Sequence, residues 1–253
     1  MPSQIDHPLI FFVVCLLALW LAAYLGEFAR RRRRKLSEDD HQDFDVVRTS
    51  ALTLLALLIG FSFSMAVARY DQRKNLEEAE ANAVGTQYLR LDLLPAEEAT
   101  RARALLKTYL DKRIAFYLAR DERDVAAIDG ETARLQADLW AMVSRAAQAQ
   151  PTPITALAIA GMNDVLNAQG YTQAAWWNRI PLTAWAMLVS AAIACNLLIG
   201  FGERRRRALL LLVFPLIVSF AFLLISDIDS PRGGIIRVLP QNLLATARSI
   251  GAQ

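Results

Sequence analysis

Four apolar runs without a charged residue stand out in the pattern of hydrophobic and polar positions. Each is close to the roughly 20 residues that an α-helix needs to cross a hydrocarbon core about 30 Å thick. The runs cover residues 8–26, 49–68, 182–201 and 208–226. The pattern predicts four transmembrane helices. The first is expected to be a retained span and not a signal peptide, because its basic block follows the apolar run.

The long segment between the second and third runs has an amphipathic pattern. It is rich in Ala, Leu, Glu and Arg, and its apolar residues recur at spacings of three and four, which is typical of packed helices. We expect the second span to continue as one helix from Thr49 to Leu94, followed by helices that begin at Pro95 and that cover 121–148 and 154–168. No useful length alternates with period two. The predicted fold class is therefore an all-α integral membrane protein with an inserted helical bundle.

Two basic blocks indicate how the spans are oriented. Residues 30–35 are five arginines and a lysine, and residues 204–207 are four arginines. Basic residues in short loops are retained on the cytoplasmic side of a membrane. Both blocks are cytoplasmic if the two termini lie outside. The predicted layout has 27–48 and 202–207 in the cytoplasm and 69–181 and 227–253 in the periplasm of a bacterial inner membrane.

Composition supports a membrane protein and indicates which classes of partner to expect. Of the 253 residues, 55% are hydrophobic, and the net charge of +3 conceals the two basic blocks. Such blocks can bind nucleic acid, but these directly follow apolar runs and lack interleaved aromatic residues. We expect contact with membrane lipid, including anionic head groups, and no nucleic-acid partner.

No set of residues points to catalysis or to a cofactor. The two histidines, His7 and His41, belong to no recognisable Ser/His/Asp or Cys/His arrangement, and there is no phosphate-binding glycine motif. The acidic stretch 38–45 contains possible metal ligands but lacks the spacing of a calcium loop. A solvated linker that offsets the adjacent basic block is the better interpretation. We therefore predict no enzyme activity, no metal and no cofactor.

Small and hydroxyl-bearing residues follow one side of the second span at spacings of three and four. Such residues are the usual material of helix packing in membranes. In the alternative interpretation, several copies of the stripe surround a pore, and Leu57 or Phe61 forms a hydrophobic constriction that gates by dewetting. The candidate pore-lining residues are Thr53, Leu57, Gly60, Phe61, Ser64 and Val67.

Ionisable residues gather where the second and fourth spans end on the predicted outer face. A carboxylate at a helix C-terminus is unfavourable by about 0.3–1 kcal/mol, so two aspartates there require compensation. Ionisable groups at this depth pair or line a water-filled path. The alternatives are an ion-pair network within one subunit and a ring of charge at a pore mouth. The cluster consists of Arg69, Asp71, Arg73, Asp227, Asp229 and Arg232.

Two smaller features complete the pattern around the spans. Trp176 and Trp177 come directly before the third span, which is typical of an interfacial aromatic belt; a ligand-binding aromatic site is the alternative. After the fourth span, Pro231 predicts a turn, and Gly233 and Gly234 allow positive φ there.

Two stretches carry a resemblance to a known family. Residues 60–95, GFSFSMAVARYDQRKNLEEAEANAVGTQYLRLDLLP, and residues 227–244, DIDSPRGGIIRVLPQNLL, resemble the bestrophin-like domain family of bacterial and plastid membrane proteins. The similar arrangement of spans, insertion and tail covers nearly the whole chain. The family name implies a distant likeness to bestrophins, which are pentameric anion channels with the second span lining the pore. Bestrophins keep the insertion in the cytosol, whereas the arginine blocks here predict it outside.

The resemblance and the polar stripe together predict a homo-oligomeric ion channel, a pentamer by analogy. The alternative is a non-conducting membrane scaffold or envelope sensor whose periplasmic bundle binds a partner. A transporter is a weaker third interpretation, because the spans contain no buried acid and no evident inverted repeat.

Overall fold

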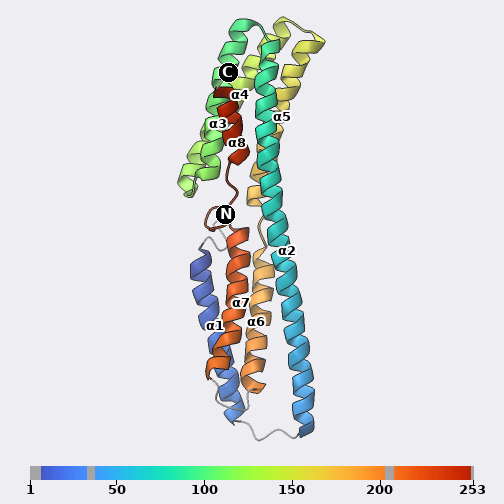
Figure 1. Ribbon diagram of the computed structural model, residues 1–253, viewed down its shortest axis with the longest axis vertical. Helices are drawn as coiled ribbons and strands as arrows, with labels where there is room; N and C mark the ends of the chain where they lie inside the picture. Colours follow the sequence, from blue (N-terminus) through green and yellow to red (C-terminus); the bar gives the residue numbers. More distant parts are fainter. Residues whose placement is uncertain (1–6, 33–37, 203–207, 252–253) are drawn as a thin grey trace. The chain divides into compact units, whose positions relative to one another are not determined.

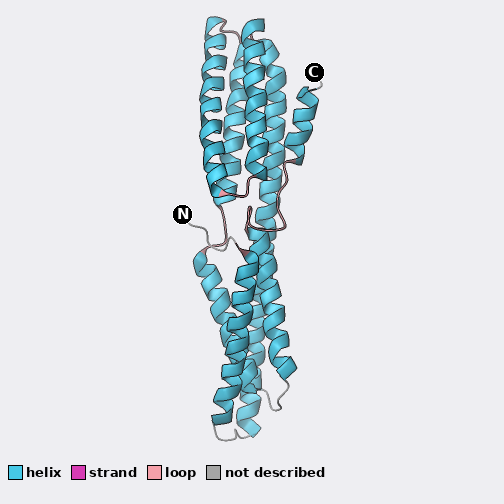
Figure 2. Ribbon diagram, turned by 90° about the vertical axis from the view of Figure 1, so that its left-hand side faces the viewer, coloured by secondary structure: helices cyan, strands magenta, loops and turns pink. Residues whose placement is uncertain are grey.

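The computed structural model describes residues 7–32, 38–202 and 208–251, without the side chains of 38–41 and 208–210. These residues form α-helices, one short 3₁₀-helix and loops, with no strand in the described part of the chain (Figure 2). The predicted all-α class is confirmed. The helices are α1 (Pro8–Arg32), α2 (Glu38–Arg90), η1 (Leu91–Leu93), α3 (Ala96–Leu118), α4 (Glu122–Ala149), α5 (Pro153–Trp177), α6 (Leu182–Gly202), α7 (Ala208–Asp229) and α8 (Gln241–Gly251).

The chain divides into two compact units (Figure 1). The first unit combines Met1–Ala68 with Arg179–Ile236 and contains α1, α6, α7 and the first part of α2. The second combines Arg69–Asn178 with Arg237–Gln253 and contains the rest of α2 with α3, α4, α5 and α8. The chain therefore crosses between the units within α2, at the start of α6 and after α7.

Four stretches in the described residues are long and apolar enough to cross a membrane. They are Pro8–Arg32 in α1, Gln42–Leu93 in α2, Pro153–Gly202, which contains α5 and α6, and Leu211–Asp229 in α7. This agrees with the four predicted spans. The assignment of the connecting loops to the two sides of the membrane stays a prediction, and residues 33–35 and 204–207 of its basic blocks lie outside the described residues.

Glycine lets α1 and α6 approach each other closely. A Cβ atom added at Gly200 would lie 1.9 Å from the carbonyl oxygen of Ala23, and one added at Gly26 would lie 2.2 Å from the carbonyl oxygen of Leu197. Both distances are shorter than any real contact. Small residues at such crossings are typical of membrane helices, which associate mainly by close packing.

The second unit is a helical bundle around an apolar core. Fully buried core residues come from α3, α4 and α5 and include Leu106, Tyr109, Leu139 and Met162. Local signals set the helix starts: the Asp121 carboxylate accepts a hydrogen bond from the backbone N–H of Arg123 at the start of α4. This is the bundle that the amphipathic pattern predicts.

The structure changes the predicted helix limits in two places. Helix α2 begins at Glu38 and ends at Arg90, where η1 takes over before Pro95. Helix α5 continues past Ala168 to Trp177, because Thr172, Ala175 and Trp176 keep its buried side in the bundle core.

The structure also separates the two tryptophans that were expected to share an aromatic belt. Trp177 is 74% exposed, as a belt residue would be. Trp176 is buried, with its ring centroid 5.0 Å from that of Phe116 and 5.4 Å from that of Tyr117. The belt expectation is wrong for Trp176, because the last turn of α5 still belongs to the bundle core.

Candidate functional site

The predicted pore-lining stripe lies on the side of α2 that its own subunit leaves uncovered. Leu57 is 52% exposed and Phe61 is 62% exposed, while Thr53, Gly60 and Ser64 are exposed as well. A Cβ atom added at Gly60 would meet nothing within 4 Å. These side chains therefore face lipid, water or another molecule.

The opposite side of α2 packs inside the subunit. Leu55 and Ala66 are buried, and Val67, at the edge of the stripe, is half-buried. At about 100° per residue, Leu55 and Ala66 lie across the helix from Leu57 and Ser64. In its most apolar window, 11% of the residues of this span are buried, against 50% for α7. The second span thus leaves far more of its surface uncovered than the fourth.

Asp227 holds the turn that follows α7. Its carboxylate accepts hydrogen bonds from the backbone N–H groups of Ile235, at 2.7 Å, and Ile236, at 2.8 Å. Gly234 is required for a close approach, since an added Cβ atom would lie 2.2 Å from the carbonyl oxygen of Asp227. The backbone of Gly234 is not in the left-handed region, so the positive φ that the two glycines allow is not adopted at Gly234. The side chain of Asp227 therefore folds the turn back onto the helix end.

Asp229 ties the end of α7 to the segment before α6. Its carboxylate accepts a hydrogen bond from the backbone N–H of Ile180 at 3.0 Å. Arg179 donates to the hydroxyl of Ser230 at 2.9 Å and to the carbonyl oxygen of Asp229 at 3.4 Å. A cation at the last carbonyls of a helix is favourable because this end carries partial negative charge. Both aspartates are buried and act as clasps within one subunit.

The other members of the predicted charged cluster differ in exposure. Arg73 is buried, Arg69 and Arg232 are half-buried, and Asp71 is exposed. Each of the three arginines takes part in a polar or electrostatic interaction. The proposed pairing of Arg69 and Arg73 with the aspartates of α7 stays a prediction.

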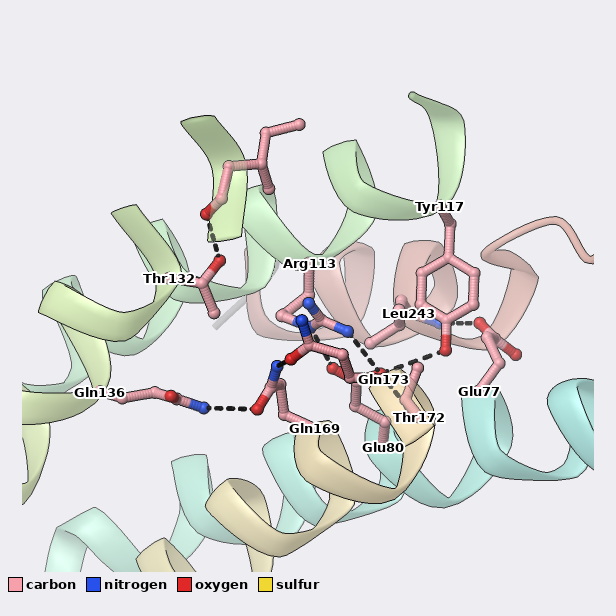
Figure 3. Close-up of polar contacts among 11 residues, drawn as sticks. Glu77, Glu80, Arg113, Tyr117, Thr132, Gln136, Gln169, Thr172, Gln173 and Leu243 are labelled. Atoms are coloured by element: carbon pink, nitrogen blue, oxygen red, sulfur yellow. Dashed lines mark hydrogen bonds and ion pairs between the residues drawn. The ribbon is translucent and has the colours of Figure 1, made fainter. Parts of the chain in front are cut away.

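A second group of buried charges lies in the bundle around Glu80 of α2 (Figure 3). Its carboxylate accepts hydrogen bonds from the guanidinium of Arg113 on α3. It also accepts from the hydroxyls of Tyr117, at 3.1 Å, and Thr172, at 3.1 Å. Glu80 and Arg113 are both fully buried. A buried ion pair is tolerated when further hydrogen bonds satisfy its charges, and here the two hydroxyls do so.

The charges of this group shift the pKa values of their neighbours. Burial raises the pKa of Tyr117 far above its ordinary value, and the negative charge of Glu80 adds to the rise. Burial and then Glu80 raise the pKa of Tyr109 in the same way, while Arg113 and the Gln136 side chain oppose the rise. Burial alone would lower the pKa of Arg113, but the charge and hydrogen bonds of Glu80 raise it above its ordinary value. Both tyrosines are neutral and Arg113 is charged at ordinary pH.

Glu77, one helical turn before Glu80, holds the C-terminal helix. Its carboxylate accepts hydrogen bonds from the backbone N–H groups of Asn242 and Leu243, both at 2.9 Å, and from the Asn242 amide at 2.6 Å. These backbone groups belong to the first turn of α8, whose N–H groups have no partner inside the helix. Glu77 is therefore an N-terminal cap supplied by another helix.

The described side chains of the stretch 38–45 form no metal site. Part of it lies outside the described side chains, and among the described residues no group of three or more His, Cys, Asp or Glu side chains is placed to hold a metal ion. The solvated-linker interpretation stays a prediction, although residues from Glu38 onward already belong to α2.

The sequence model of the bestrophin-like domain matches residues 9–243, which is nearly the whole chain. The chain belongs to the bestrophin-like domain family. The predicted family membership is confirmed. A comparison with curated proteins finds no significant match.

Solved structures show the same fold. A bacterial bestrophin homologue from Klebsiella pneumoniae is 17% identical, with a TM-score of 0.63 and with 96% of this chain and 95% of that chain covered. A variant of that homologue is 16% identical, with a TM-score of 0.63 and coverages of 95% and 96%. Another structure, described as a variant of a membrane protein, is 16% identical, with a TM-score of 0.64 and the same coverages. This bestrophin-like chain thus has the fold of the bacterial homologues.

Sequence reasoning missed the buried group of the bundle. A signal for Glu77 and Glu80 was available, because they share one helical side with Ala81, Val84 and Tyr88, all of which are buried. Carboxylates that interrupt an apolar face indicate buried partners. No comparable signal identified Arg113, because its partner is 33 residues away along the chain.

Proposed function

We propose that this protein is a homo-oligomeric ion channel of the bacterial inner membrane and that α2 lines its pore. The observation that carries the proposal is the exposed stripe of α2. Its small, hydroxyl and apolar side chains leave one side of the span without cover from the subunit. A closed ring of subunits would give this side a common axis to face. The family and the bestrophin fold support the same function.

In the proposed pore, Leu57 and Phe61 form the constriction. Both side chains are large, apolar and more than half exposed. Rings of such side chains close a narrow pore by excluding water. Thr53 and Ser64 flank them along the exposed side with hydroxyl groups, and the hydroxyl of Thr53 donates to the carbonyl oxygen of Thr49 at 2.9 Å. Gly60 leaves free space at the level of the constriction.

Asp71 continues the stripe by spacing, seven residues after Ser64, and it is exposed. A ring of such carboxylates at the mouth of the proposed pore would raise the local concentration of cations. In this proposal, Asp71 takes the role of the charged ring at the pore mouth. Asp227 and Asp229 are left as intrasubunit clasps, because their described partners hold the turns around α7.

Ion flux through liposomes that contain the purified full chain tests the proposal. We expect Leu57→Ala and Phe61→Ala to increase flux, because each enlarges the constriction. Phe63→Ala is the matched control: Phe63 is 39% exposed but lies about 120° from Leu57 and about 160° from Phe61 around α2. It should leave flux unchanged. Absence of flux in the wild type and in both constriction variants, under voltage, membrane tension and varied pH, would contradict the proposal. That result would favour a non-conducting scaffold or envelope sensor.

A further inference from the structure

Two buried hydrogen-bond donors on α3 have no acceptor among the residues that the structure describes. Nη1 of Arg113 and the hydroxyl of Tyr109 are fully buried, and neither makes a hydrogen bond of standard geometry with any residue that the structure describes. The two residues lie one helical turn apart on the same side of α3. Buried donors in native proteins are nearly always paired with protein groups or ordered water. Both groups therefore point to an acceptor that the described residues do not provide.

The other contacts of Arg113 hold its guanidinium in place. Its Nε and Nη2 atoms are engaged by the Glu80 carboxylate. The face of the guanidinium lies over the Phe116 ring, with 4.4 Å from Cζ to the ring centroid. A guanidinium is planar and rigid, so these contacts fix the direction in which Nη1 points.

A chain of side-chain amides lies beside this group, between α4 and α5 (Figure 3). Gln136 donates to Gln169 at 3.4 Å, Gln169 donates to Gln173 at 2.8 Å, and Gln173 donates to Asp129 at 3.2 Å. These side chains are partly buried. Gln136 lies close enough to Tyr109 to oppose the rise in the pKa of its hydroxyl, but the two side chains are outside standard hydrogen-bonding geometry. The half-buried seam between α4 and α5 is therefore polar.

The net charge of the Glu80–Arg113 pair indicates whether the acceptor is an anion or a neutral molecule. Glu80 and Arg113 already form a neutral pair, so a bound anion would add an uncompensated buried charge, which is strongly unfavourable. A water molecule is neutral, accepts from two donors and donates to amide oxygens. Buried waters in proteins typically make about three hydrogen bonds of this kind.

We propose that an internal water site lies between α3 and α4, where one ordered water accepts hydrogen bonds from Arg113 Nη1 and the Tyr109 hydroxyl and donates to the Gln136 amide. The water provides an acceptor for the remaining donor of the Glu80–Arg113 pair, Arg113 Nη1. It also links the buried charges to the amide chain of α4 and α5. The site is independent of whether the protein conducts ions.

A high-resolution map of the full chain, from crystals grown in sodium bromide, tests the site directly. We expect a density peak within hydrogen-bond distance of both Arg113 Nη1 and the Tyr109 hydroxyl, without bromide anomalous signal. An anomalous peak at this position would make it an anion site, and the absence of density would leave the donors unpaired. Either result overturns the proposal.

Radiolytic hydroxyl labelling tests the site in solution, because a bound water can be converted to a radical beside buried side chains. We expect Tyr109 to be oxidised several-fold faster than Tyr117, which is equally buried on the same helix but donates its hydroxyl to Glu80. Equal rates would overturn the proposal. In the maps of variants, Tyr109→Phe should lose the water density and Tyr117→Phe should keep it. Density that persists in Tyr109→Phe would show that the tyrosine does not share the water.

Discussion

The two stretches of α2 arrange their polar and apolar side chains in opposite ways. Along 49–68, large apolar residues such as Leu57 and Phe61 are exposed. Along 69–90, the same helix buries Arg73, Glu77, Glu80 and Gln87. The first stretch belongs to an apolar span whose exposed side chains can face lipid, so burial within the chain is unnecessary. The second is buried among other helices, where each charge requires a specific partner. The exposure of a side chain on α2 therefore has a different cause in each of the two stretches.

The largest expected effect comes from removing Glu80. The Glu80→Ala variant leaves Arg113 buried without its carboxylate, and breaking a buried pair in this way costs about 3–5 kcal/mol. We expect the free energy of unfolding of the purified protein in detergent to fall by that amount. Glu78→Ala is the control, since Glu78 is exposed two residues away, and it should change stability by less than about 0.5 kcal/mol. If the two variants lost the same free energy of unfolding, the burial of Glu80 would not explain its contribution to stability.

Removing Glu77 should act locally on α8. In Glu77→Ala, the first turn of α8 loses a carboxylate acceptor, and hydrogen bonds to charged groups contribute about 1.5–3 kcal/mol. We expect faster amide hydrogen exchange in 241–251 and unchanged exchange in α4. Exchange that rises equally in both helices would mean that Glu77 supports the whole bundle instead of one helix.

Alkaline pH should destabilise the bundle through its buried tyrosines. The pKa values of Tyr109 and Tyr117 are raised in the folded protein, so the folded state retains these protons more tightly than the unfolded state. This contribution is complete below the ordinary tyrosine pKa of about 10, and it is lost as pH rises from there toward the folded values. The titration of each tyrosine lowers the free energy of unfolding by up to about 1.4 kcal/mol per pH unit in this range.

Alkaline unfolding curves of tyrosine variants check this expectation. The Tyr117→Phe variant should lose stability less steeply above pH of about 10 than the wild type. Tyr171→Phe, at a tyrosine that is 65% exposed, should follow the wild type. If the Tyr117→Phe curve is as steep as the wild-type curve, other groups cause the alkaline loss.

The smallest expected effect on stability comes from Asp71. It is exposed, so Asp71→Asn should change the free energy of unfolding by less than about 0.5 kcal/mol. In the proposed channel, the same change removes a ring of negative charge at the pore mouth. The reversal potential in a salt gradient should therefore shift toward lower cation preference. A conducting protein whose reversal potential is unaffected by Asp71→Asn would place the charged ring elsewhere.

Hydropathy and helical period were sufficient for the four spans, the all-α bundle and the presence of a stripe of small and hydroxyl residues on one side of α2. Such features depend on side chains that are close in sequence, because the length of an apolar run and the spacing of three or four are local properties. The unusual aspartates at the end of α7 were also visible as a local conflict between carboxylates and a helix C-terminus. The groups that compensate these aspartates could not be predicted from local sequence, because Ile180, which donates to Asp229, lies 49 residues away along the chain.

Long-range partners were decided by tertiary packing alone. The pairing of Glu80 with Arg113, the cap that Glu77 gives to α8 and the burial of Trp176 each join segments that are separate along the chain. A buried charge is stable only where the fold brings enough donors to it at once. That requirement can be recognised in the sequence as a carboxylate on an apolar face, but the donors become identifiable only when the helices are packed together.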